Sequence, residues 1–260
     1  MLGPDSGVTR QEVSITDPAA VDALLVARRP DWVFNCAAYN AVDRAETEPE
    51  LAHAINSEGP FNVAVACARH QARFVHFSTN FVFDGSLDRP YVESDPPSPQ
   101  GAYARSKLDG ERRVLEVLPQ ALVLRTAAVF GGNRGLSFPE RMIQRIKEGG
   151  ELRVVSDQRV NPTYTGDLAR AALELVEGGG VGIFHTVSDG CCTFYEFARA
   201  VLEEVWLPVR VEAVSTAEFA SPARRPLNGC LSSERFRALR HWRESLHEWA
   251  SGHDWGGRKP

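Results

Sequence analysis

Residues 74–79 read FVHFST, a short apolar run that ends in two hydroxyl residues. A run of this length and composition is typical of a buried strand in a parallel sheet. Two other runs have the same character, WVFNCAA from Trp32 and LVLRTAAVFG from Leu122. Patterns with helical spacing lie between them, over residues 18–29 and 48–70. This alternation predicts an α/β fold with a doubly wound parallel sheet.

Length, charge and hydropathy argue against a nucleic-acid-binding or membrane protein. The 260 residues are enough for one large domain or for a main domain with a smaller lobe. The formal net charge is -5 and no block is rich in Lys or Arg, so neither nucleic acid nor an anionic membrane is an expected partner. No apolar run reaches the roughly 20 residues that span a bilayer, and the N-terminus has no signal-peptide core.

The cysteines and histidines give no sign of a metal site. The five cysteines are odd in number and lack CxxC spacing, which predicts free thiols in a reducing compartment and hence a cytoplasmic protein. The seven histidines are scattered. His76 lies within a predicted strand, so we expect it to be a core or edge residue.

A tyrosine and a lysine follow a proline-rich loop. Residues 86–102 contain four prolines and lead into a helix predicted to begin near Tyr103. Tyr103 and Lys107 are four residues apart and would share one helix face. Thr79 is expected at the carboxyl end of a strand, where ligands bind in such sheets. A neighbouring ammonium lowers a phenol pKa from about 10, so Tyr103 could protonate a carbonyl oxygen that Thr79 holds. For the Tyr-Lys pair alone, a chance surface arrangement is the alternative.

Longer runs carry a family resemblance. RPDWVFNCAAYNAVDRAETEPELAHAIN, FVHFSTNFVFDG and VVSDQRVNPTYTGDLA resemble the extended short-chain dehydrogenase/reductase superfamily and, within it, the dTDP-4-dehydrorhamnose reductase family. The likeness extends from about residue 13 to the end. It implies that Thr79, Tyr103 and Lys107 are catalytic and that NADPH, with NADH as the alternative, supplies a hydride. The implied reaction is reduction of the 4-keto group of a nucleotide-linked deoxy sugar, dTDP-4-dehydro-L-rhamnose, for cell-wall polysaccharide.

A change in sequence pattern after about residue 150, together with the resemblance, predicts two parts of the chain. Residues 1–150 would form a Rossmann-like dinucleotide-binding domain, and residues 151–260 a mostly substrate-binding lobe interleaved with the main sheet, with helices over 193–205 and 232–239. The expected glycine-rich phosphate loop is not found near the N-terminus, so a first β-α unit of roughly 30 residues is expected to be missing. The remaining cofactor wall is predicted to comprise Cys36, Ala37, Ala38, Tyr39, Asn56, Ser78, Tyr103 and Lys107.

Four residues are predicted to bind the substrate. Asn80 directly follows Thr79, and Asn161 and Thr163 flank a proline in a rigid turn, for which a helix-capping loop is the alternative. Arg225 belongs to ARRPLNGC, and its planar guanidinium suits a diphosphate. For the oligomeric state of the protein, we consider a homodimer.

Two alternatives stay open. The absent phosphate loop leaves the activity of this chain undecided and favours a non-catalytic regulatory subunit of the same fold, like the β subunit of methionine adenosyltransferase. The intact set of Thr79, Tyr103 and Lys107 argues against that role. A reductase or epimerase of another nucleotide sugar is favoured by Ala128, which stands where the family pattern RTSWVYG has tryptophan.

Overall fold

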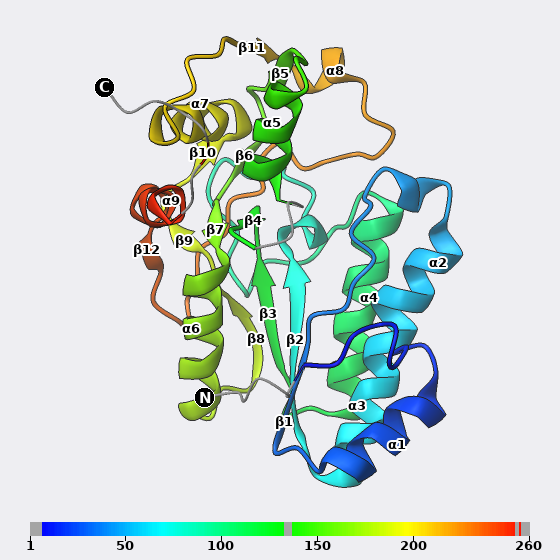
Figure 1. The fold of residues 1–260 in the computed structure, drawn as a ribbon. Helices are drawn as coiled ribbons and strands as arrows, with labels where there is room; N and C mark the ends of the chain where they lie inside the picture. Colours follow the sequence, from blue (N-terminus) through cyan, green and yellow to red (C-terminus); the bar gives the residue numbers. More distant parts are fainter. Residues whose placement is uncertain (1–6, 133–136, 253–254, 256–260) are drawn as a thin grey trace. The chain divides into compact units, whose positions relative to one another are not determined.

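The computed structural model describes residues 7–132, 137–252 and 255, which form two compact units (Figure 1). The first unit collects the described residues of Met1–Ser78, Gly101–Leu124 and Gly180–Ile183. The second collects those of Thr79–Gln100, Arg125–Gly179 and Phe184–Pro260. Each unit is therefore built from three separate segments, and the division near residue 150 stays a prediction.

Most residues of a four-stranded sheet belong to the first unit. Its strands, in spatial order, are β1 (Trp32–Asn35), β2 (Arg73–Thr79), β3 (Leu122–Thr126) and β8 (Gly182–His185). β1 and β2 are parallel, and Asn35 lies opposite His76. The prediction of an α/β fold with a parallel sheet is confirmed. β1 is the edge strand among the described residues, and a missing first β-α unit stays a prediction.

The first unit also contains helices and helical turns. They are α1 (Pro18–Arg28), the 3-10 turn η1 (Arg44–Glu46), α2 (Pro49–His53), the π-helical turn η2 (Ala54–Glu58), α3 (Gly59–His70) and α4 (Ala102–Val117). α1, α3 and α4 lie side by side (Figure 1). Apolar residues of α1, α3 and α4, such as Val63 and Cys67 at helical spacing on α3, form one buried cluster with Phe74 of β2 and Val123 of β3.

The second unit has short strands and its own core. Its elements are η3 (Asn80–Val82), β4 (Val129–Phe130), α5 (Phe138–Lys147), β5 (Leu152–Val155), β6 (Arg159–Val160), β7 (Thr163–Tyr164), α6 (Thr165–Glu177), β9 (Ser188–Asp189), β10 (Cys192–Thr193), α7 (Phe194–Glu204), β11 (Val211–Val214), α8 (Thr216–Phe219), β12 (Leu239–His241) and α9 (Trp242–Ser251). Phe130, Phe197, Trp242 and Trp249 are aromatic members of the core. Within the described residues, no helix combines the length and the apolar character needed to cross a membrane.

Two sequence expectations are wrong. Residues 232–239 form no helix. Instead the Ser233 hydroxyl accepts hydrogen bonds from the N–H groups of Arg235 and Phe236, and the Glu93 carboxylate accepts one from the N–H of Glu234, so side chains satisfy donors that would otherwise favour a helix.

The cysteines are not all free, because Cys191 and Cys230 form a disulfide. Their Cα atoms lie 6.1 Å apart, within the range that a disulfide spans. The fold brings the two residues together although 39 positions separate them in the sequence. The expectation of free thiols therefore holds only for Cys36, Cys67 and Cys192.

Candidate active site

The start of α4 is held by a side chain from far earlier in the sequence. The Glu46 carboxylate accepts a hydrogen bond of 2.8 Å from the N–H of Ala102, the first residue of the helix. Negative charge at a helix N-terminus also interacts favourably with the helix dipole. The prediction that a helix begins near Tyr103 is confirmed, and this contact fixes where its first turn lies.

Tyr103 and Lys107 lie one turn apart on α4. Both are buried, with 8% of Tyr103 and 2% of Lys107 exposed. The Lys107 Nζ donates a 2.7 Å hydrogen bond to the carbonyl oxygen of Phe77 on β2. Burial lowers the Lys107 pKa to about 8, against the attraction of the Glu111 carboxylate, which raises it. Lys107 therefore changes its charge close to neutral pH. Its hydrogen bond to Phe77 holds the Nζ atom against β2, the strand that ends at Thr79.

Asn56 connects the loop after β1 to α4. Its Oδ1 accepts the N–H of Tyr39 at 2.8 Å, and its Nδ2 donates to the Tyr39 carbonyl at 3.1 Å and to Ser106 Oγ at 3.0 Å. Asn56 is fully buried in the π-helical turn η2. The side chain thus fixes the backbone of Tyr39 relative to the helix that carries Tyr103. A direct contact between Asn56 and a cofactor stays a prediction.

The first unit also offers groups that a ligand could contact. Ser78 is 5% exposed, and its Oγ has no hydrogen-bond partner within the described residues. Cys36 and Ala37, just beyond β1, are exposed, and Ala38 and Tyr39 are partly exposed. A buried hydroxyl without a partner is costly, so a bound group that hydrogen-bonds to Ser78 would be favourable.

In the second unit, Thr79 and Asn80 begin the turn that follows β2. The Thr79 Oγ1 accepts the N–H of Phe81 at 3.2 Å and donates to the Asn80 Oδ1 at 3.3 Å. The Asn80 Nδ2 donates to the Gly229 carbonyl at 2.8 Å. Asn80 therefore anchors the segment that follows Arg225, and its predicted contact with a substrate is not needed to explain its burial.

Asn161 and Thr163 are also engaged by the protein. The Asn161 Nδ2 donates to the carbonyls of Ser188 and Gly190 at 3.1 and 3.0 Å, and its Oδ1 accepts the N–H of Leu231 at 2.8 Å. The Thr163 hydroxyl donates to the Asn161 carbonyl at 3.1 Å. These contacts join β9, β6 and the segment around Leu231, so a role of either residue in substrate binding stays a prediction.

Arg225 lines a small cavity of the second unit. The cavity has a volume of about 180 Å³, and Phe138, Phe194 and Phe219 also line it. The guanidinium donates hydrogen bonds to Ser221 Oγ and, at 3.3 Å, to the Ala223 carbonyl. The neighbouring Arg224 is exposed. Arg225 is thus held by contacts within the second unit, and its binding of a substrate diphosphate stays a prediction.

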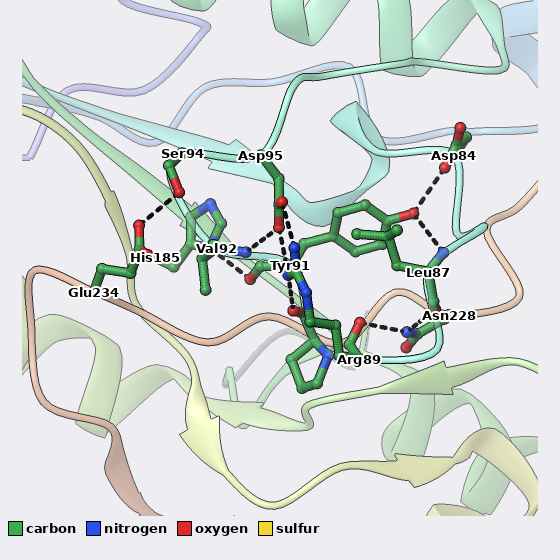
Figure 2. Close-up of polar contacts among 11 residues, drawn as sticks. Asp84, Leu87, Arg89, Tyr91, Val92, Ser94, Asp95, His185, Asn228 and Glu234 are labelled. Atoms are coloured by element: carbon green, nitrogen blue, oxygen red, sulfur yellow. Dashed lines mark hydrogen bonds and ion pairs between the residues drawn. The ribbon is translucent and has the colours of Figure 1, made fainter.

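The proline-rich loop is held by polar contacts that the sequence did not reveal. Figure 2 shows the Tyr91 hydroxyl donating to Asp84, at 2.7 Å, and Arg89 paired through two nitrogens with Asp95, both at 2.7 Å. Asn228 donates to the carbonyls of Leu87 and Arg89 at 2.6 and 2.9 Å. Hydrogen bonds, led by the N–H of Ser86 for Asp84 and by Arg89 for Asp95, lower the pKa of each carboxyl to about 2. The loop is therefore fixed to the segment that follows Arg225. No group of His, Cys, Asp or Glu suited to a metal ion occurs in the part of the chain described here.

Comparison with known proteins identifies the family. The model of the RmlD substrate binding domain matches residues 5–253. The chain belongs to this family. A dTDP-4-dehydrorhamnose reductase of Mycobacterium tuberculosis is 44% identical to this RmlD-family chain over 250 residues, covering 92% of this chain and 82% of the relative. A probable dTDP-4,6-dihydroxy-2-methyloxan-3-one 4-ketoreductase of Streptomyces antibioticus is 43% identical over 244 residues, covering 91% and 82%.

Solved structures agree with this assignment. A dTDP-4-dehydrorhamnose reductase from Bacillus anthracis, in complex with NADP, has a TM-score of 0.91 at 33% identity and covers 95% of this chain and 89% of its own. A dTDP-4-dehydrorhamnose reductase from Clostridium acetobutylicum has a TM-score of 0.88 at 37% identity and covers 93% and 87%. The predicted family and the Rossmann-like α/β fold are therefore confirmed.

Several groups of the first unit are chemically suited to contact a dinucleotide. Cys36 and Ala37, just after β1, are small and exposed, and the Ser78 hydroxyl, buried without a hydrogen-bond partner among the described residues, can bond to a ligand. Lys107 can donate to ribose hydroxyls with the hydrogens that its bond to Phe77 leaves available.

Proposed function

We propose that this RmlD-family protein reduces the 4-keto group of a dTDP-linked deoxy sugar with NADPH, converting dTDP-4-dehydro-L-rhamnose to dTDP-L-rhamnose for cell-wall polysaccharide. The observation that carries the proposal is the buried Tyr103 and Lys107 pair on α4, in which the Lys107 pKa is about 8. The names of the relatives and the NADP bound by the Bacillus anthracis structure support the substrate and the cofactor.

The proposed chemistry uses the residues in distinct roles. Bound NADPH supplies the hydride to C4 of the sugar. Tyr103 gives its phenolic proton to the carbonyl oxygen, so the ketone gains one hydride and one proton and becomes an alcohol. The Lys107 ammonium favours the phenolate that remains and so makes the phenol a stronger acid. Thr79 donates a hydrogen bond to the same oxygen, and solvent returns the proton to Tyr103.

Substrate binding and context complete the proposal. Arg225 binds the diphosphate, because a guanidinium fork matches two phosphate oxygens. Asn80, Asn161 and Thr163 shape the sugar side, either by direct contact or by holding the loops that they bond. The protein acts in the cytoplasm as a homodimer, and light scattering of the purified protein tests that assembly.

Turnover with a matched control tests the function. The protein should consume NADPH when dTDP-4-dehydro-L-rhamnose is present, and Tyr103→Phe should reduce the rate by at least 100-fold, in line with the usual contribution of an acid catalyst. Tyr195→Phe, at a partly buried position of α7, is the control and should keep the rate. The five tryptophans allow NADPH binding to be followed by fluorescence. Turnover by Tyr103→Phe at more than a few per cent of the original rate would remove the tyrosine from its role.

A further inference from the structure

Lys107 is connected through His76 to Asn35 by a chain of buried side chains in the first unit. His76 Nε2 lies 3.5 Å from Lys107 Nζ, and His76 Nδ1 lies 3.2 Å from Asn35 Nδ2. Asn35 is 6% exposed, and His76 is completely buried. The parallel register of β1 and β2 places Asn35 opposite His76. From the sequence we expected His76 to be a core or edge residue, and no local pattern indicated that it pairs with Asn35.

The orientation of the Asn35 amide is fixed by the backbone. The Ala37 N–H donates to Asn35 Oδ1 at 3.1 Å. A backbone N–H can only donate, so the atom that faces Ala37 must be the oxygen and the atom that faces His76 must be the nitrogen. The amide nitrogen also can only donate, and therefore His76 Nδ1 accepts and carries no proton.

These contacts also determine which ring nitrogen of His76 carries the proton. Burial, together with the charge of Lys107, keeps the His76 pKa well below its usual value, so the ring is neutral. A neutral imidazole with an unprotonated Nδ1 carries its proton on Nε2. That N–H faces Lys107 Nζ, which already donates to the Phe77 carbonyl. An ammonium has no lone pair to accept it, whereas a neutral amine has one.

We propose, on the basis of the function above, that Asn35 and His76 are positioning residues for Lys107: they fix its Nζ and, through the Nε2–H donor, stabilise its neutral amine form. Two ionisable groups act in opposite directions on the lysine. Glu111, on α4, attracts the ammonium, while His76, on β2, favours the amine. Tyr103, one turn earlier on α4, is the phenol that the charge of Lys107 acts upon. The pair thus sets the pH at which Lys107 loses its charge.

Asn35→Asp exchanges donors and acceptors along the hydrogen bonds that run from residue 35 through His76 to Lys107, and it hardly changes the shape of the side chain. A carboxylate would accept from His76 Nδ1–H, so the ring proton would move from Nε2 and Nε2 would accept from the Lys107 ammonium. We expect Lys107 to hold its proton at least 10-fold more tightly, because the hydrogen bond to the ammonium and the added charge act together. Asn40→Asp, at an exposed position of the same loop, adds the same charge without facing His76 and is the control.

Nuclear magnetic resonance tests the inference without using activity. The chain has three lysines, so ¹³Cε-lysine labelling gives few signals, and Lys107→Met identifies the one that titrates near neutral pH. ¹⁵N-histidine spectra, assigned with His76→Gln, should show His76 protonated on Nε2. Lys107 should titrate at least one pH unit higher in Asn35→Asp and unchanged in Asn40→Asp. A His76 ring protonated on Nδ1, or a Lys107 titration that Asn35→Asp leaves in place, would overturn the inference. Because neither readout needs turnover, an inactive protein would contradict the proposed function alone.

Discussion

Lys107 should destabilise the folded protein at neutral pH, and its replacement by methionine measures how much. The pKa of Lys107 is about 8 in the folded chain and 10.5 ordinarily. At 1.36 kcal/mol for each pH unit, this difference costs about 3 kcal/mol. Methionine has a similar length and no charge, but it loses the bond to the Phe77 carbonyl, worth about 1 kcal/mol. Lys107→Met should therefore raise the free energy of unfolding at pH 7 by about 2 kcal/mol.

The pH dependence separates this cause from general packing. Because the folded pKa is lowered, the unfolded chain holds the lysine proton more tightly, so the cost is complete below about pH 8 and disappears as the pH rises toward 10.5. The advantage of Lys107→Met should thus fall to about zero at pH 10. Urea unfolding of both proteins from pH 7 to pH 10 measures it, with Lys147→Met as the control at an exposed lysine. A difference between variant and parent that stays constant over this range would refute the reasoning.

Three further results are expected. Gly110→Ala should destabilise the protein by about 1 to 3 kcal/mol in urea unfolding, since the new Cβ would lie 2.1 Å from the Asn56 carbonyl oxygen; Gly252→Ala, with 3.6 Å to its nearest atoms, should cost far less. Thiol titration of the unfolded, unreduced protein should find three thiols, and five would contradict the disulfide. Cys191→Ser, which frees Cys230, should show four thiols and be less stable by about 3 to 4 kcal/mol. Turnover should decline on the alkaline side with a pKa of about 8, as the catalytic lysine loses its charge; a rate that is flat to pH 9.5 would contradict this.

The sequence predicted the elements that depend on local pattern. Continuous apolar runs identified β2 and β3, and the turn residues of the proline-rich segment identified a loop before α4. Within the predicted helix, the four-residue spacing of Tyr103 and Lys107 was enough to place them one turn apart on the same face. Their burial, and the low pKa that follows from it, come from packing that spacing does not describe.

Long-range contacts account for what the sequence did not predict. The segment 232–239 has helical composition, but Glu93, more than 130 positions earlier, bonds its backbone instead. The disulfide joins Cys191 to a residue 39 positions away. Asn35 and His76 meet through the register of two parallel strands. In each case the deciding partner is distant in the chain, so no local pattern indicates it.

Transfer of a labelled hydride tests the central claim most directly. The protein, supplied with dTDP-4-dehydro-L-rhamnose and NADPH deuterated at the transferable position, should yield dTDP-L-rhamnose that carries one deuterium at C4, as mass spectrometry and proton spectra would show. Tyr103→Phe should form almost none of this product under the same conditions, with NADPH supplied at a concentration that saturates the variant. Product without deuterium, or labelled product formed equally well by Tyr103→Phe, would contradict the account.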